Sequence, residues 1–178
     1  KLPDTVNIMI EEESVVYAIK SSDGQWWMMD SDGRVVEQAN NAKAATATQV
    51  LGVTLEAPTV NEKGVATEMT PSETNELGEL IPVTTTGAQR LTAALQILKA
   101  LENNDIVGEA ASVDVTSTED IILWYGTRYQ VNLGDTSRLD YKVDCMNDAI
   151  LQMSDYQSGV LDISFTIWPN QVGYTPFA

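Results

Sequence analysis

The chain has 178 residues, of which 43% are hydrophobic and 20% are charged, a composition typical of folded globular domains. Ten basic residues stand against 26 acidic ones, so the formal net charge is −16. Nucleic-acid binders and proteins that dock on anionic membranes need basic surfaces, so this charge argues against both as direct partners. The sequence contains no run of about 18 apolar residues, the length that a membrane-spanning helix needs.

The residue types that carry much of enzyme chemistry are scarce. The sequence has no histidine, which removes the commonest general base, the commonest zinc ligand and any serine–histidine triad. Its one cysteine, Cys145, cannot form an intramolecular disulfide and lies in a helix-like stretch, where we interpret it as a packed thiol. We therefore expect no metal site, no cofactor and no catalytic residue.

The first part of the sequence predicts strands. Residues 5–10 alternate apolar and polar side chains, and an acidic run follows at 11–13. Residues 15–37 hold three apolar runs separated by two turns that contain Asp and Gly, which is typical of a three-stranded meander. The second turn, at 30–33, has two carboxylates but lacks the further oxygen ligands of a calcium loop, so we interpret it as a plain turn.

The segment after the meander has a weaker pattern. Residues 38–86 are rich in Ala, Thr and Asn and sparse in apolar side chains. Within them, Val-Leu-Gly-Val at 50–53 has the composition of a short buried piece of chain. The remainder, 54–86, is long and polar, so we interpret it as an insertion or a long loop.

Apolar spacing predicts two helices. Thr86 and Gln89 have the spacing of a capping box, and four leucines then fall on one helical face: Leu91, Leu95, Leu98 and Leu101. The second helix is expected to begin with Asp135 or Thr136 as its N-cap. Its apolar stripe is spaced by four, three and four residues: Leu139, Val143, Met146 and Ile150.

Strands fill the rest of the C-terminal half. Runs at 112–116, 121–125 and 129–133 are apolar or alternating, which favours three strands. The cleanest alternation lies in 158–167, and Pro169 ends it because proline cannot donate to a sheet. The element order predicts an α+β fold with a largely antiparallel sheet, two main helices and a C-terminal edge strand.

Motifs for catalysis are missing from the sequence. It has no phosphate-binding glycine loop, no G-x-S-x-G elbow and no Cys or His cluster. Acidic residues are numerous enough for a two-carboxylate glycosidase, but no pair stands out. Trp26 and Trp27 could form a platform for a sugar, although neighbouring strand residues point to opposite faces. The residues alone favour a binding module.

Short motifs follow one another along the whole chain. They are the strand with an acidic ending at 2–12, the Asp-x-Asp-Gly-x-Val hairpin at 30–35, Leu51-Gly52, the Tyr-x-Val-x-Leu-Gly run at 129–134, Gly-Val-Leu-Asp-Ile at 159–163 and the Tyr-x-Pro-Phe tail at 174–177. In this order, with the helices between them, they resemble the extracytoplasmic region of the FtsQ/DivIB family of bacterial cell-division proteins. The sequence departs from the family at 54–86, which is longer and more polar.

The resemblance implies two parts and a location. Residues 1–13 would be the last strand of a truncated POTRA domain, and 14–178 would be the FtsQ/DivIB β domain. Since the chain begins with Lys1 rather than Met, we interpret it as a piece of a longer protein. A missing N-terminal segment would anchor that protein in the cell membrane by a single span, with this region outside, at the division septum.

The resemblance also implies a function. Members of the family are non-catalytic scaffolds of the divisome. They bind FtsL and a second small division protein, FtsB, called DivIC in Gram-positive bacteria, and through them influence septal cell-wall synthesis. We therefore expect this chain to be a protein-binding scaffold rather than an enzyme.

In the family, the last strand of the domain is an open edge to which a partner adds a strand. The resemblance places that strand at 158–167, where unpaired backbone groups would be free to bind. The expected partner-binding residues lie on this strand and on the neighbouring hairpin: Ser158, Leu161, Asp162, Ser164, Thr166, Trp168, Tyr129 and Arg128. Trp168 is the strongest anchor, because aromatic side chains dominate binding hot spots. Alternatively, the strand is structural and the tail 171–177 covers its edge.

Two other functions stay open at this point. The chain could be a secreted acidic cell-wall or carbohydrate-binding module, or a glycosidase, that uses Trp26 or Trp27 with nearby carboxylates. It could also be a surface or adhesion domain with no role in division. A short basic tail, one membrane span and a complete POTRA domain upstream would favour the divisome.

Overall fold

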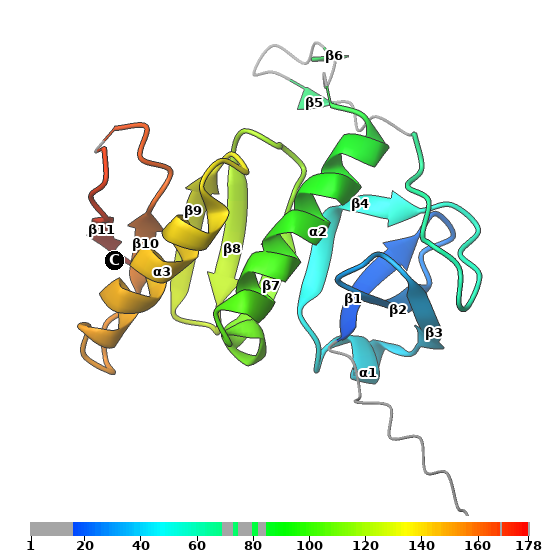
Figure 1. The fold of residues 1–178 in the computed structure, drawn as a ribbon, viewed down its shortest axis with the longest axis horizontal. Helices are drawn as coiled ribbons and strands as arrows, with labels where there is room; N and C mark the ends of the chain where they lie inside the picture. The colour runs from blue at the N-terminus through cyan, green and yellow to red at the C-terminus, as the bar shows by residue number, and fades with distance from the viewer. Residues whose placement is uncertain (1–15, 69–72, 75–79, 82–84, 168, 178) are drawn as a thin grey trace, which may run out of the picture.

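The computed structural model describes residues 16–68, 73–74, 80–81, 85–167 and 169–177. Most of the strands in these residues form one nine-stranded sheet (Figure 1). In spatial order its strands are β11 (Gly173–Pro176), β10 (Gly159–Asp162), β9 (Tyr129–Gly134), β8 (Ile121–Tyr125), β7 (Ala110–Asp114), β4 (Gln49–Leu55), β1 (Val16–Ser21), β2 (Trp26–Asp30) and β3 (Val35–Ala39).

The remaining elements are helices and one small hairpin. They are α1 (Asn41–Ala44), β5 (Glu73–Thr74), β6 (Leu80–Ile81), α2 (Gly87–Asn103), the 3-10 turn η1 (Val107–Glu109) and α3 (Leu139–Leu151). The strands β5 and β6 pair only with each other, within the segment expected to be an insertion or loop.

The sheet is mixed but mostly antiparallel. The meander β1–β2–β3, the run β7–β8–β9 and the pair β10–β11 are antiparallel. The strand β4 lies parallel to β1 and to β7, and β10 lies parallel to β9. Helical crossovers account for two of these parallel pairs, because α2 connects β4 to β7 and α3 connects β9 to β10. The chain passes from β1 to β4 through β2, β3 and α1. The predicted α+β class is confirmed.

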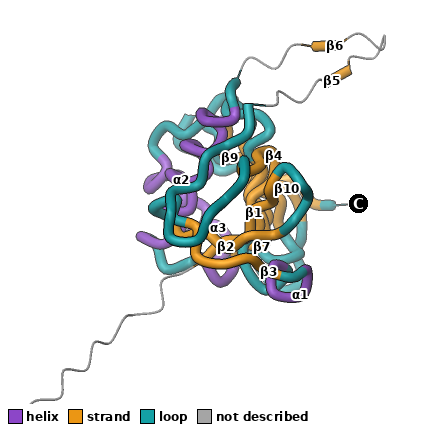
Figure 2. Tube along the Cα trace, turned by 90° about the vertical axis from the view of Figure 1, so that its right-hand side faces the viewer, coloured by secondary structure: helices purple, strands orange, loops and turns teal. Residues whose placement is uncertain are grey.

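Helices α2 and α3 cover one face of the sheet and contact each other (Figures 1 and 2). The capping box predicted at the start of α2 is present, since Gln89 N–H donates to Thr86 Oγ1 and Thr86 N–H donates to Gln89 Oε1. Three of the four leucines predicted on its inner face are buried, and Leu95 is partly buried against the same core. Helix α1 packs on a separate, smaller cluster around Ala18 and Met28.

The start of α3 differs from the sequence prediction. The helix begins at Leu139, and its N-cap is Arg138, whose φ of 56° lies in the left-handed region. Neither Asp135 nor Thr136 caps it. Asp135 Oδ1 instead accepts hydrogen bonds from the Ser137 N–H and from the Lys142 ammonium. The Asp135 side chain therefore binds these two groups and does not cap the helix.

The last predicted strand is shorter than its alternation indicates. Only Gly159–Asp162 are extended as β10, because the Asp162 carboxylate accepts from the N–H and hydroxyl of Ser164 and turns the chain. Phe165 follows with a φ of 58°, and Ile167 is 67% exposed. Strand β10 is also not the edge, because β11 pairs with it on the outer side.

Parts of the sequence predictions lie outside the described residues. These are the strand expected within 1–13, most of 69–84, and Trp168.

Candidate partner-binding edge

Strand β11 forms the edge of the sheet at its C-terminal end. The ladder places Tyr174 opposite Leu161 and Pro176 opposite Gly159, and Phe177 N–H donates to Ser158 O at 3.1 Å. Because the backbone groups of an antiparallel strand point alternately to either side, Tyr174 and Pro176 turn theirs away from β10. Proline has no N–H to leave unpaired, so its place here is typical of an edge strand.

Side-chain contacts hold β11 against the sheet. The Tyr174 hydroxyl donates to Ser158 O at 3.1 Å, and the Phe177 ring stacks on Trp124 with 6.2 Å between centroids. Trp124 alternates along β8 with Leu123, which belongs to the main core, so the two point to opposite faces of the sheet. Phe177 therefore anchors the end of the tail on the face opposite α2 and α3, whereas Tyr174 packs against the main core.

Close approach of β10 and β11 depends on Gly159. A Cβ at this position would lie 2.3 Å from Thr175 O, which no side chain can occupy. The Gly-Val-Leu-Asp-Ile motif thus encodes an inner strand that accepts β11 as its neighbour.

Most of the predicted residues of 158–167 are used inside the fold. Leu161 is fully buried in the core, and Ser158 O accepts hydrogen bonds from β11. The side chains of Asp162 and Ser164 form a turn, in which Ser164 Oγ also accepts from Thr166 N–H at 3.3 Å. Of these residues Thr166 alone is exposed.

The predicted hairpin residues Arg128 and Tyr129 also have internal partners. Arg128 donates from Nε to Gln157 O at 3.1 Å and from Nη2 to Ser154 O at 2.8 Å. It also donates to the hydroxyl of Tyr129, whose side chain is fully buried. This network ties the β8–β9 hairpin to the loop before β10, which is a structural role.

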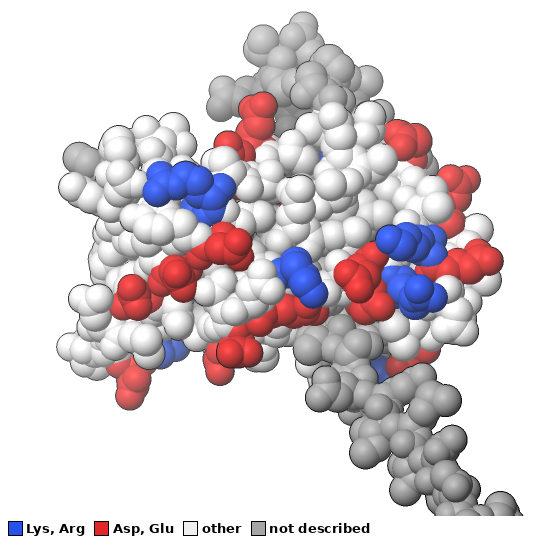
Figure 3. Space-filling view, in the orientation of Figure 1, with Lys and Arg blue, Asp and Glu red and all other residues white. Residues whose placement is uncertain are grey.

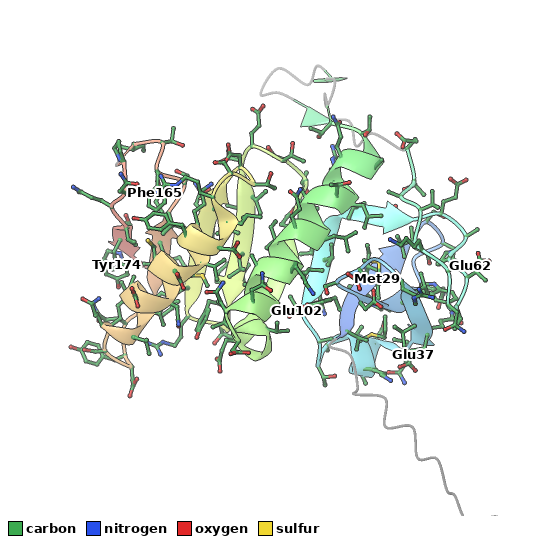
Figure 4. The ribbon with its side chains drawn as sticks, viewed as in Figure 1. Met29, Glu37, Glu62, Glu102, Phe165 and Tyr174 are labelled. Atoms are coloured by element: carbon green, nitrogen blue, oxygen red, sulfur yellow. The ribbon has the colours of Figure 1, made fainter. Side chains whose placement is uncertain are left out.

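The sequence did not predict which large hydrophobic side chains are exposed near the β11 end of the sheet. Of eight large hydrophobic side chains exposed among the described residues, five lie in the C-terminal third: Tyr141, Leu151, Tyr156, Ile167 and Phe177. Tyr174 and Phe165 mark this end of the molecule in Figure 4. The Tyr-x-Pro-Phe motif at 174–177 was the one sequence feature that pointed to this segment. The sequence did not predict that 173–176 form a strand, because these residues do not alternate between apolar and polar side chains.

The opposite edge of the sheet is partly covered. The Val35 N–H on β3 donates to Glu62 O at 2.8 Å, and Val35 O accepts from the Asn61 N–H at 2.8 Å. The backbones of Arg34 and Lys63 form an isolated antiparallel β-bridge. The loop 59–64 therefore occupies the start of this edge. The edge at β11 has no such neighbour among the described residues.

The tryptophan pair considered for sugar binding does not form one platform. Trp27 packs on the main core and donates from Nε1 to Ser21 Oγ at 3.2 Å. Trp26 packs on the smaller cluster, with the Lys20 ammonium 5.0 Å from its ring centroid. The two rings lie on opposite faces, as the strand alternation predicted, and each is only partly exposed.

Among the described residues, the carboxyl groups with shifted pKa values all have lowered ones, which is opposite to the raised pKa of a glycosidase acid. Hydrogen bonds from Ser21 and the Gln25 backbone lower the pKa of Asp23, and those from Lys142 and Ser137 lower the pKa of Asp135 to about 2. Partial burial acts to raise the pKa of Glu102, but hydrogen bonds from Ser31, Tyr17 and Lys99 bring it below its ordinary value. A general acid needs a raised pKa.

The described residues contain no group of three or more His, Cys, Asp or Glu side chains placed to hold a metal ion. Acidic side chains spread over the face that carries α2 and α3, with basic ones between them (Figure 3). None of the helices in the described residues is both long enough and apolar enough to cross a membrane.

Comparison with known proteins gives no match. No family model, no curated protein and no solved structure is similar to the chain. The geometry of the β11 edge is therefore the basis for a functional proposal, together with the motifs in the sequence.

Proposed function

We propose that the chain is a non-catalytic extracytoplasmic scaffold of the FtsQ/DivIB type, which binds FtsB/DivIC- and FtsL-like division proteins at the septum. The observation that carries this proposal is the open edge of β11 at the C-terminal end of the sheet. A missing N-terminal segment would hold the protein in the cell membrane, and its partners would transmit binding to septal cell-wall synthesis.

Strand addition in this proposal takes place on β11 rather than on 158–167. Tyr174 offers one N–H and one C=O to an added strand, and Pro176 offers a C=O. Main-chain bonds of this kind give affinity, while side-chain contacts select the partner. The exposed rings of Tyr156 and Phe177 and the exposed Ile167 supply apolar surface for those contacts.

The test is a titration with the extracellular segment of the FtsB/DivIC-like protein from the same genome, followed by backbone NMR. We expect shifts centred on 173–177. Tyr174→Pro removes the outward N–H together with the Tyr174 ring and its hydroxyl. We expect its dissociation constant to be about tenfold higher than that of a variant that loses the side chain alone, the value of one lost hydrogen bond. Tyr174→Ala is the matched control, because it also removes the ring and the hydroxyl bond to Ser158 but keeps the N–H.

Two outcomes would contradict the proposal. Folded wild-type protein that shows no shifts at high partner concentration would remove strand addition. Shifts centred on Trp26 and Trp27 with a cell-wall polysaccharide, and none with the division protein, would favour the carbohydrate-binding module instead. The Tyr174→Pro variant must keep the wild-type spectrum outside β11, which establishes that it is folded.

A further inference from the structure

A second feature lies at the carboxyl ends of the parallel strands, away from β11. Strands β1, β4 and β7 run side by side in one direction, and α2 begins at the end where β4 stops (Figure 1). A cavity of ≈ 440 Å³ opens there, and its walls include Gly52, Thr116 and Gly87, the first residue of α2. In sheets with parallel strands this is the usual place for a ligand, and helix N-termini favour anions.

Arg90 is the residue that gives this cavity a specific chemistry. Its side chain lines the cavity and is 2% exposed. Nε donates to Thr85 Oγ1 at 3.3 Å, and Nη1 donates to Gly52 O at 3.2 Å. Nη2 is the one buried side-chain nitrogen or oxygen that has no hydrogen-bond partner among the described residues. A buried charged donor without an acceptor is costly, so native proteins rarely keep one without a reason.

The charges around the cavity are opposite to those of the whole molecule. The chain has 26 acidic residues against 10 basic ones, yet the described residues that line the cavity include no acidic one. Arg90 supplies the charge of the cavity, because the ammonium of Lys20, the other charged residue in its wall, lies 5.0 Å from the Trp26 ring centroid. Hydroxyl groups of Ser22, Thr54, Thr67 and Thr116 also belong to the wall. Those of Thr54 and Thr67 hydrogen-bond each other, and Thr67 Oγ1 donates to Thr54 O at 3.2 Å, so Ser22 and Thr116 are the hydroxyl donors considered for a ligand. Hydroxyls and a guanidinium are the donors that phosphate and carboxylate groups accept from.

We propose that this cavity binds a small ligand through an oxyanion, a phosphate or a carboxylate group, that accepts a hydrogen bond from Arg90 Nη2. The same guanidinium holds the β4 bulge through Gly52 O, so the fold presents it in a fixed orientation. Binding would satisfy the free donor and place the negative charge near the first turn of α2. The site is separate from the β11 edge and does not depend on the proposed partner.

The rival explanation gives Arg90 a structural role only. In that case its hydrogen bond to the bulge is its whole contribution, and Nη2 stays without an acceptor. The two explanations differ in one measurable property, which is saturable binding of an oxyanion at this cavity.

The test titrates the chain with sodium phosphate and, separately, with sodium acetate, each against sodium chloride of equal ionic strength. We expect saturable NMR shifts at the amides of Gly52, Gly87 and Thr116 with phosphate or acetate and none with chloride. The two arms distinguish a phosphate ligand from a carboxylate ligand. Absence of saturable shifts with both anions would overturn the proposal.

Two variants sharpen the result. Arg90→Gln should raise the dissociation constant about tenfold or more, because a charge-assisted hydrogen bond is lost. Lys63→Gln removes an exposed cation elsewhere and should change it less than about twofold. If Arg90→Gln does not fold, Arg90→Lys takes its place, since lysine lacks the second donor of the fork. An unchanged dissociation constant in the folded variant would assign the anion to another site.

Discussion

Lys142 is a buried cation whose position depends on one neighbour. Its side chain is 2% exposed, and Nζ donates to the backbone O and to Oδ1 of Asp135, both at 2.8 Å. The hydrogen bonds from Lys142 and Ser137 lower the pKa of Asp135 from 3.8 to about 2. A carboxyl group whose pKa is lowered by folding stabilises the fold at pH values above its pKa in the unfolded state. This stabilisation is lost as the pH falls through its pKa in the folded state.

Asp135→Asn should therefore destabilise the fold in a pH-dependent way. We expect a loss of about 2 kcal/mol at about pH 7, because the buried ammonium loses its counter-charge. The difference in unfolding free energy between wild type and variant should shrink by about 1 kcal/mol between about pH 4 and pH 2. This value is smaller than the full pKa shift implies, because Asp135 is largely exposed and solvent screens the interaction. Urea unfolding at several pH values measures both quantities.

Replacement of the cation tests the same pair from the other side. Lys142→Met keeps most of the side-chain volume and removes the buried charge, so we expect a change below about 1 kcal/mol near neutral pH. A pH-independent loss in Asp135→Asn would contradict the ion pair as the cause. The prediction from sequence that Asp135 or Thr136 caps α3 was wrong, since the N-cap is Arg138. For Asp135 the reason is one that the local sequence does not show, because Lys142, seven residues later, donates to its Oδ1.

At the scale of elements, the bulge in β4 shows what local sequence can and cannot predict. The register of β4 against β1 shifts between Ile19 and Lys20, and Gly52 in the bulge has a φ of 83°. A Cβ there would lie 2.2 Å from Thr116 N, so both conformation and space require glycine. The Val-Leu-Gly-Val pattern predicted a buried piece of chain, but nothing in it locates the neighbour at Thr116.

Gly24 offers a matched control for Gly52. Its φ is also 83°, and a Cβ there would have no heavy atom within 4 Å. We expect Gly24→Ala to cost about 1 kcal/mol from backbone strain alone. Gly52→Ala should cost at least about 2 kcal/mol more, because the Thr116 backbone must also move. Thermal and urea unfolding measure the difference, and equal losses would show that the bulge relaxes freely.

Elements whose periodicity extends over several residues were predicted well. The meander, α2 with its capping box and the strands β8 and β9 were confirmed, because local propensity and packing agree there. The prediction failed after Asp162, where the side chain bonds Ser164 and Phe165 takes a left-handed φ. Alternation continues in the sequence beyond the point where a local turn ends the strand.

For the whole molecule, the α+β class and the presence of an edge strand near the C-terminus follow from the order of elements. The sequence does not predict which strand forms this edge, because β11 has only four residues, one of them proline, and shows no periodic pattern of apolar side chains. The tail 171–177, considered from sequence as a cover for the strand in 158–167, does pair with β10, and its strand β11 is the edge of the sheet in the part of the chain that the structure describes. A covering strand transfers the free edge outward instead of closing the sheet.

This transfer predicts how the two ends of the sheet respond to a partner. In free protein, we expect amide hydrogens of the central strands β7 and β8 to exchange slowest and those facing outward on β11 to exchange fastest. An added strand should protect the outward amide of Tyr174. Exchange on β3 should stay unchanged, since Val35 already pairs with the loop at 61–62. Hydrogen exchange followed by NMR, with and without the partner, measures this. Protection gained on β3, with β11 unchanged, would place the binding edge at the opposite end of the sheet.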